Sequence, residues 1–252
     1  MKRKLILLCA LLIMFLPALK VDATVVSDTI AKKTPVKSTK YESSGLNYIM
    51  YLQIPKSLLG DYQYDETFSY DEEEDNYGFE MSVYFFKNKK RYKFDSLKDH
   101  SSFYEGNNKV YCMMYAEKRY AGNQGFAYKY RYYVIDENGN KTYSKYSKET
   151  VVIPYVTGPS SSIAQKGSTR VSWQKMKGAK SYTVYTCMMN GKNKKKVITT
   201  TKNYATINTS KFKKNKCYYY YVKANGVKYK NKRYSTGKFD VVDYCNLLYV
   251  MY

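Results

Sequence analysis

Few side chains in this sequence could act as acid–base catalysts or hold a metal ion. The 252 residues include one histidine, His100, which lies in the polar stretch SLKDHSSF. A histidine base or a multi-histidine metal site would have to use this one residue. A lone histidine among polar residues is typical of a solvated surface. We therefore expect no catalytic role for His100, no metal centre and no cofactor, and we interpret the protein as a non-enzyme.

An acidic run, Asp71–Asp75, places five carboxylates in one short segment. Several converging oxygens could hold calcium, but the run lacks the alternating spacing and the glycine of a calcium-binding loop. Glycoside hydrolysis needs two carboxylates that face each other about 5–10 Å apart, which neighbours in one loop do not provide. We interpret the run as a solvated loop, and calcium binding stays open.

The first 23 residues predict a signal peptide. The basic residues 2–4 precede an apolar run, Leu5–Leu16, which Pro17 ends, and small residues at 21–23 offer a cleavage site. The run is shorter than the roughly 20 residues that cross a bilayer, which favours cleavage over the alternative of an uncleaved anchor. We expect a secreted, extracellular protein without a membrane span in its mature chain.

Positive charge is concentrated in the last part of the chain. Residues 41–156 contain 15 basic and 17 acidic side chains, whereas residues 157–252 contain 20 basic and 2 acidic ones. Of those 20, 18 are lysine, which suits diffuse attraction to phosphates, while base readout in nucleic acids favours the forked arginine group. The charge predicts a polyanionic partner and no specific nucleic acid.

Short segments rich in β-branched and aromatic residues alternate with turns of Gly, Asn, Asp and Lys, which predicts an all-β fold. Residues 24–43 are polar and show no periodicity, so we expect a flexible lead-in. The clearest predicted strands are TRVSWQ (169–174), SYTVYT (181–186), KKVITTT (195–201), NYATIN (203–208), CYYYYVKA (217–224) and KFDVVDY (238–244).

The four consecutive tyrosines of CYYYYVKA must point alternately to the two faces of their strand. Tyr218 and Tyr220 share a face with Val222 and Ala224, so this face is predicted to be buried. The other face contains Tyr219 and Tyr221 and ends in the charged Lys223, so these side chains are predicted to be far more exposed.

Residues 157–243 resemble the fibronectin type III domain family. Trp173 in VSW resembles the core tryptophan of the family's second strand, and GAKSYTVY resembles its third strand. The spacing of Phe212 and Tyr218 resembles the tyrosine corner, whose hydroxyl bonds to the backbone of the preceding turn. That turn, KKNK, lacks the usual Pro-Gly. Such lysine- and tyrosine-rich versions resemble those of exported proteins from Gram-positive bacteria.

A weaker copy of the same pattern precedes it. Phe79 and Met81 align with Tyr182 and Val184, with Tyr70 in the place of the tryptophan, and YKYRYYV (128–134) aligns with YYYYV at its core positions. The resemblance implies an all-β chain of two tandem immunoglobulin-like (fibronectin type III-like) β-sandwiches. The predicted divisions are a signal peptide (1–23), a lead-in (24–43), a divergent sandwich (44–156) and a basic sandwich (157–252).

The resemblance also implies a binding face on the second sandwich. Lysine-rich turns would border one sheet, where ammonium groups attract anions and tyrosine rings can stack on sugars. The alternative is that A/T-rich codons enrich Lys and Tyr without any function. The same topology places Cys187 and Cys217 on neighbouring strands, where a disulfide or two thiols remain open. The predicted binding residues are Tyr185, Tyr219, Tyr221, Lys194, Lys195, Lys196 and Lys223.

These observations favour an exported, non-catalytic binding or adhesion module at a bacterial cell surface. Its predicted partner is an anionic cell-wall polymer, a glycan or a surface protein, and it could be associated with the wall. The alternative is a spacer or accessory protein without its own ligand. Such a protein would assemble through edge strands or through the apolar tail NLLYVMY (246–252).

Overall fold

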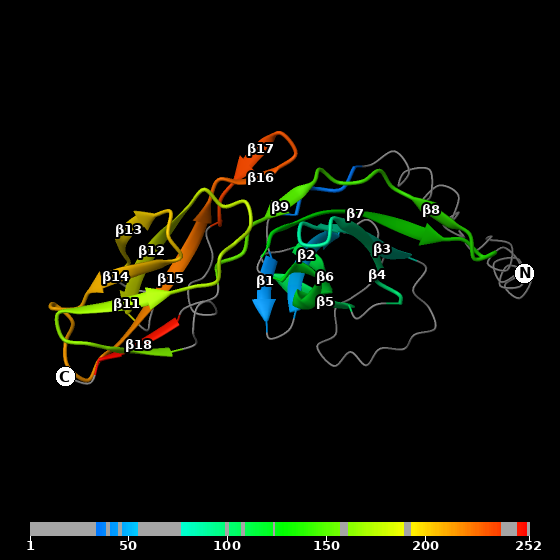
Figure 1. Ribbon diagram of the computed structural model, residues 1–252. Helices are drawn as coiled ribbons and strands as arrows, with labels where there is room; N and C mark the ends of the chain where they lie inside the picture. The colour runs from blue at the N-terminus through cyan, green and yellow to red at the C-terminus, as the bar shows by residue number, and fades with distance from the viewer. Residues whose placement is uncertain are drawn as a thin grey trace, which may run out of the picture.

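The described part of the chain is built almost entirely of β-strands. Its one helix is α3 (Lys118–Ala121), and no described helix has the length and hydropathy needed to cross a membrane. Figure 1 shows two groups of strands that lie end to end, with β9 leading from one group to the other. The computed structural model describes residues 34–38, 41–44, 47–54, 77–98, 101–106, 109–122, 124–156, 161–188, 193–237 and 246–250.

The first sandwich consists of two sheets. One sheet has the spatial order β1 (Tyr41–Ser44), β2 (Asn47–Ile54), β6 (Lys109–Glu117) and β5 (Ser101–Gly106). The other has the order β4 (Lys90–Asp95), β3 (Tyr77–Phe85), β7 (Phe126–Ile135) and β8 (Lys141–Tyr143), with β9 (Thr150–Val152) also paired to β7.

The strand β7 shows why this sequence forms a sandwich. Alternate residues of FAYKYRYYVI lie on opposite faces, so Phe126, Tyr128, Tyr130 and Tyr132 all enter the core between the sheets and are at most 1% exposed. The partner sheet contributes apolar side chains with the same period of two, among them Met50, Leu52, Cys112 and Met114.

The second sandwich also consists of two sheets and has a separate core. The five-stranded sheet has the order β10 (Ser161–Ala164), β18 (Asn246–Val250), β15 (Cys217–Asn225), β12 (Ser181–Met188) and β13 (Lys195–Thr200). The facing pair is β11 (Ser168–Ser172) with β14 (Tyr204–Asn208), and a hairpin of β16 (Val227–Tyr229) and β17 (Lys232–Tyr234) extends from the sandwich.

The second core forms around Trp173 and Tyr182, whose rings meet edge to face with centroids 5.6 Å apart. Five of the six clearest predicted strands are present as β11 to β15, and the sixth, 238–244, lies outside the described residues. Both units are fibronectin type III-like β-sandwiches, so the all-β prediction of two tandem sandwiches is confirmed. The predicted signal peptide and the exact domain boundaries remain predictions.

The tyrosine strand β15 has the predicted register, but the predicted contrast in exposure is wrong for Tyr221, which is buried, and is not seen between Tyr218 and Tyr219, which are both half-buried. Tyr220, Val222 and Ala224 are fully buried between the sheets, and Tyr218 packs against the same core while half-buried. On the opposite face Tyr219 is half-buried, but Tyr221 is only 1% exposed. The outward face of this sheet is therefore partly covered.

The tyrosine corner is present at the predicted residues. The rings of Phe212 and Tyr218 stack with centroids 4.0 Å apart, and the backbone N–H of Lys213 donates a hydrogen bond to the Tyr218 hydroxyl at 3.1 Å. The hydroxyl acts as the acceptor that closes the turn before β15.

We expect Tyr218→Phe to lower the free energy of unfolding by about 1 kcal/mol, because it removes one hydrogen bond and keeps the ring stack. Tyr219→Phe, on the same strand, is the control and should change stability by less than about 0.5 kcal/mol. Urea denaturation of both variants measures the difference. Equal stability losses would show that the corner hydroxyl contributes nothing specific.

Part of the predicted flexible lead-in is structured. Residues 41–44 form β1, and the Ser38 hydroxyl lies 2.7 Å from the Tyr51 carbonyl oxygen, to which it donates. Tyr130 donates from its hydroxyl to the Val36 carbonyl oxygen at 2.8 Å. Val36 and Ser38 are held by hydrogen bonds to buried tyrosines, and residues 41–44 are held by backbone pairing with β2.

The proposed internal repeat is correct in strand arrangement and wrong in detail. In the first sandwich the antiparallel pair β3 and β7 has β4 beside β3. In the second sandwich the antiparallel pair β12 and β15 has β13 beside β12. Met81 lies opposite Tyr130, whereas Val184 lies opposite Val222 and not opposite Tyr218, so the alignment is off by four residues. Because a shift of four residues is a whole number of two-residue periods, the side chains that were aligned still point to the core in both sandwiches.

Candidate functional site

Most of the predicted binding residues come together on one face of the five-stranded sheet, with Lys195 as the exception. Tyr185 and Tyr221 stack with their centroids 5.1 Å apart, and the Lys194 ammonium lies 5.5 and 5.0 Å from the two rings. Lys196 is paired with Tyr185 across β12 and β13, so it lies on the same face. Lys195 points to the other face, and all three lysines are exposed.

Tyr155 explains why Tyr221 is not exposed. The ring of Tyr155 meets that of Tyr221 edge to face at 5.5 Å, and both are buried. Tyr155 is held over the sheet by the backbone bridge between Val156 and Val222. Lys223, another predicted binding residue, donates a hydrogen bond to the Gly237 carbonyl oxygen at 2.8 Å. The tyrosines of this face therefore pack mainly on one another, and the ring of Tyr221 has no face open to a sugar.

The remaining candidates from the sequence have different outcomes. Cys187 is buried and lies opposite Tyr219. It is not bonded to Cys217, which precedes Tyr219 by two residues on β15 and is half-buried. His100 and the acidic run 71–75 lie outside the described residues.

The outer face of the first sandwich carries charges that are paired within the sandwich. The guanidinium of Arg131 lies 3.7 Å from the ring centroid of Tyr143 and 4.7 Å from that of Tyr146. Lys129 and Lys141 extend this stack of rings and cations, at 4.0 Å from Tyr146 and 3.9 Å from Tyr133 respectively. Such contacts are worth about 0.5–2 kcal/mol each.

The repeated Tyr-Ser pattern of YSKYS (143–147) positions these rings. The Ser144 N–H donates to the Tyr132 carbonyl oxygen, and the Tyr132 N–H donates to the Ser144 hydroxyl, at 2.9 and 3.1 Å. Ser147 makes the same reciprocal pair with Tyr130, at 2.8 and 3.1 Å. Both serines therefore bond to β7, and the tyrosines beside them contact Arg131.

Glu80 is the acidic centre of this face. It accepts hydrogen bonds from Tyr146, from Arg131 at 3.0 Å and from Lys93 at 3.2 Å, and its side chain is 10% exposed. Burial alone would raise the pKa of Glu80, but the hydrogen bonds from these three side chains outweigh burial and hold the pKa below its usual value. The carboxylate is thus fully used inside the sandwich.

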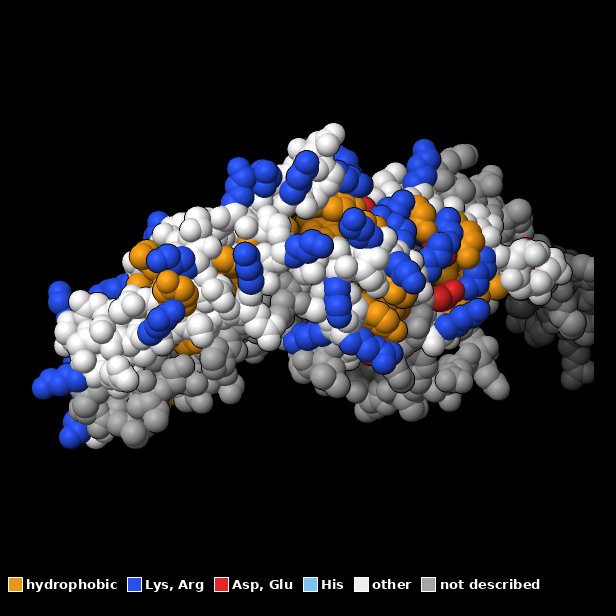
Figure 2. Space-filling model, in the orientation of Figure 1, with side chains coloured by type: hydrophobic (Ala, Val, Ile, Leu, Met, Phe, Trp, Pro, Cys, Tyr) orange, Lys and Arg blue, Asp and Glu red, His pale blue; other side chains and the backbone are white. Residues whose placement is uncertain are grey.

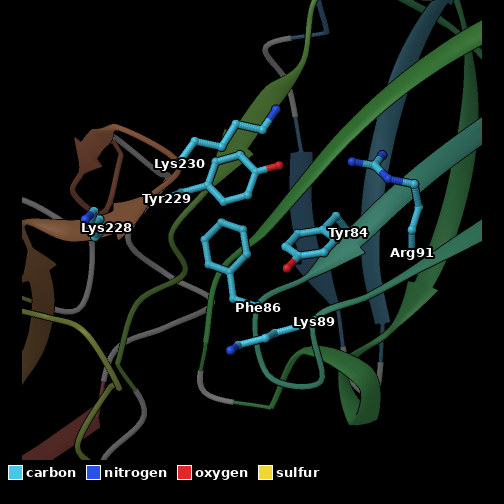
Figure 3. Close-up of a pocket in the computed structure, with 7 residues that line it drawn as sticks. All are labelled: Tyr84, Phe86, Lys89, Arg91, Lys228, Tyr229 and Lys230. Atoms are coloured by element: carbon cyan, nitrogen blue, oxygen red, sulfur yellow. The ribbon is translucent and has the colours of Figure 1, made fainter.

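A groove between the two sandwiches was not predicted from the sequence. It is a hollow of about 500 Å³, and we call it the junction groove. One wall comes from β3, β4 and the turn between them, and the other from β16 and the turn that follows it (Figure 3). The lining residues are Tyr84, Phe86, Lys89, Arg91, Lys228, Tyr229 and Lys230.

Aromatic rings form the floor of the junction groove. Phe86 and Tyr229 stack with centroids 4.6 Å apart and planes 18° apart, and Tyr84 lies 5.8 Å from Tyr229. Phe86 also packs against the second core, so the two sandwiches meet through apolar contact. Figure 2 shows the corresponding hydrophobic patch below the β16–β17 hairpin, with Lys and Arg side chains around it.

Glu149 joins the two walls of the groove. It pairs with Arg91 of the first sandwich at 3.2 Å and with Lys230 of the second at 2.8 Å, and it accepts a hydrogen bond from the Tyr229 hydroxyl at 3.1 Å. Burial acts to raise the pKa of Glu149, but the bonds from Lys230 and Arg91 outweigh burial and keep the pKa below its usual value.

One sequence signal could have indicated this groove. The segments FKNKKRY (86–92) and YKNKRY (229–234) share an aromatic residue, a Lys-Asn-Lys turn and an Arg-Tyr pair. Each forms a hairpin turn with a lysine in the left-handed region, Lys89 at φ 54° and Lys230 at φ 51°. Two similar basic hairpins meet at the junction, although they come from different sandwiches.

Comparison with known proteins gives distant structural similarity only. No protein-family model matches the chain, and no curated protein matches it. A chicken tenascin segment of two fibronectin type III domains is 13% identical, with a TM-score of 0.28, over 85% of this chain and 98% of that one. The chicken interferon gamma receptor alpha chain is 11% identical, with a TM-score of 0.28, over 86% and 98%.

The first three fibronectin type III domains of chicken CNTN1 are 11% identical, with a TM-score of 0.26, over 77% of this chain. The chain spans 62% of the length of that CNTN1 segment. The fold assignment rests on the strand order, the two cores and the tyrosine corner, and not on these similarities.

Proposed function

We propose that this chain is a non-catalytic binding module, exported to the outside of a bacterial cell, whose second sandwich holds it on an anionic wall polymer or glycan. One observation carries the proposal. The described residues 161–188, 193–237 and 246–250 contain 18 lysine and arginine residues and no aspartate or glutamate. Of these 18 side chains, 17 are exposed, and the exception, Lys223, is half-buried.

The two sandwiches differ in how they use charge. In the first, Glu80 and Asp95 pair with Arg131, Lys93 and Lys141. In the second, no acidic side chain is present among the described residues, and Lys230 pairs with Glu149 of the first sandwich. The other cations act together on the surroundings as an attractive potential for anions. Among those 18 residues only Arg170 and Arg233 are arginine, which favours diffuse attraction over forked recognition.

Reversing the charge of three exposed lysines tests this proposal. We expect the full chain to be retained on isolated Gram-positive cell walls at low salt and to be released as salt rises, because charge attraction is screened over about 8 Å at physiological ionic strength. Replacing Lys194, Lys195 and Lys196 together by glutamate should remove most of the salt-sensitive retention. A sedimentation assay over a salt series measures it.

A matched control uses three exposed lysines of the first sandwich, Lys98, Lys145 and Lys148, also replaced by glutamate. This variant should keep most of the retention. Equal losses in both variants would show that only total charge matters and not its location in the second sandwich. If the unaltered chain ignores walls at low salt, the spacer or accessory interpretation replaces the proposal.

A further inference from the structure

The lysines of the junction groove include two with an unusual backbone. Among the described residues other than glycine, four have positive φ, namely Lys89, Asn193, Asn215 and Lys230. Asparagine tolerates this left-handed region well, whereas lysine does so less readily. Both of these lysines line the junction groove. Backbone strain of this kind is concentrated at ligand sites, where the surrounding structure holds a side chain in place.

Charge in the junction groove is unbalanced. Arg91 and Lys230 share one carboxylate, Glu149, while neither Lys89 nor Lys228 forms an ion pair with any residue that the structure describes. Four cations therefore face one anion. Figure 3 shows the three rings grouped between these cations, with Lys230 and Lys89 on opposite sides of the ring group.

The groove also has the size and the surface of a small-ligand site. Its volume of about 500 Å³ lies within the usual range for such sites, roughly 300–1,000 Å³. Tyr84 and Phe86 are half-buried, so part of each ring borders the hollow. An aromatic surface suits the C–H faces of a sugar ring, and the surrounding ammonium and guanidinium groups suit an anion.

We infer that the junction groove binds a sugar unit that carries one anionic group, either a phosphate or a carboxylate. The ring would lie against Tyr84 and Phe86, and the anion would contact Lys89. This inference deepens the proposed function and rests on it, because it adds recognition of the repeating unit of an anionic polymer to the diffuse attraction of the second sandwich.

The test is an NMR titration of the full chain with glucose 1-phosphate, at about 0.3 M salt, where charge attraction over longer distances is largely screened. The tyrosine and phenylalanine resonances of the groove should shift. Lys89→Asn should weaken binding about tenfold, the equivalent of one lost charged contact. It should not lower the melting temperature, because asparagine suits the left-handed backbone better than lysine.

Lys232→Asn is the matched control, since it removes the same charge from an exposed position in the β16–β17 hairpin that does not line the groove. It should change binding by less than about twofold. Tyr84→Leu keeps an apolar side chain and removes the ring, and it should also weaken binding. Equal effects of the two lysine variants would overturn the inference.

Three further probes define the ligand class. Glucuronate in place of glucose 1-phosphate distinguishes a carboxylate from a phosphate source, and binding of either supports the inference. Inorganic phosphate should bind more weakly than the sugar phosphate, and equal binding would overturn the role of the rings. Tighter binding of an acidic peptide would also overturn it. Retention of the chain on walls at low salt is measured independently, so either result can fail without the other.

Discussion

Replacing Tyr221 by alanine is expected to lower the free energy of unfolding by about 3–5 kcal/mol, as much as replacing Tyr220. Both side chains are at most 1% exposed, although they lie on opposite faces of β15. Tyr220 fills the core between the sheets, and Tyr221 fills a small cluster with Tyr155, Cys187, Tyr185 and Tyr219. Removing either ring leaves a cavity that its neighbours cannot close.

Chemical denaturation of the two alanine variants and of Tyr219→Ala measures the effect. Tyr219 is half-buried, so its replacement should cost less than either of the others, about 1 kcal/mol. A cost for Tyr221→Ala as small as that for Tyr219→Ala would mean that Tyr155 does not cover the sheet in solution.

Replacing Glu80 by glutamine is expected to cost about 3 kcal/mol at neutral pH. The change leaves Arg131 in the ring stack without its carboxylate, and losing one partner of a buried pair typically costs about 3–5 kcal/mol. Arg131 is 22% exposed, which places the expected value at the low end. Thermal or urea denaturation measures it, and Glu117→Gln is the control, because Glu117 is 46% exposed.

The same variant has a distinct pH dependence. The pKa of Glu80 is lowered in the folded state, so its ionised form contributes stability above the unfolded value of about 4.3. That contribution is lost as the pH falls through the lowered folded-state value. The unaltered chain should therefore lose more stability between about pH 5 and pH 2 than Glu80→Gln does. Parallel pH curves would contradict the assigned role of Glu80.

The strands of the second sandwich could be predicted from the sequence because each is rich in β-branched and aromatic residues and is bounded by turn residues, and in CYYYYVKA the two faces could be assigned from the alternation of side chains. The corner of Phe212 and Tyr218 was predictable because its six-residue spacing resembles the tyrosine corner of the fibronectin type III family. The alternation of side chains along β15 could not show that another residue covers the outward face of the sheet. Tyr155, more than sixty residues from Tyr221, covers the outward face of the sheet, and no local pattern encodes such long-range packing.

The junction groove was missed for a similar reason. Its two walls come from hairpins about 140 residues apart, and each hairpin alone looks like a solvated turn of lysines. Only the contact of Phe86 with Tyr229, and the pairing of Glu149 with both Arg91 and Lys230, turns two basic loops into one site. The internal repeat suggested two similar units, but a repeat contains no information on how the units meet.

The place of β18 in its sheet sets the order in which the second sandwich can be completed. β10 is hydrogen-bonded in that sheet only to β18, which in turn joins it to β15. A ribosome, or an export channel that passes the chain amino end first, delivers β18 after every other described strand. Until residues 246–250 emerge, β10 has no partner in the sheet, although its own residues were made some eighty positions earlier. The edge of the sheet next to β15 thus stays open for most of synthesis, and its closure couples folding to the arrival of the end of the domain.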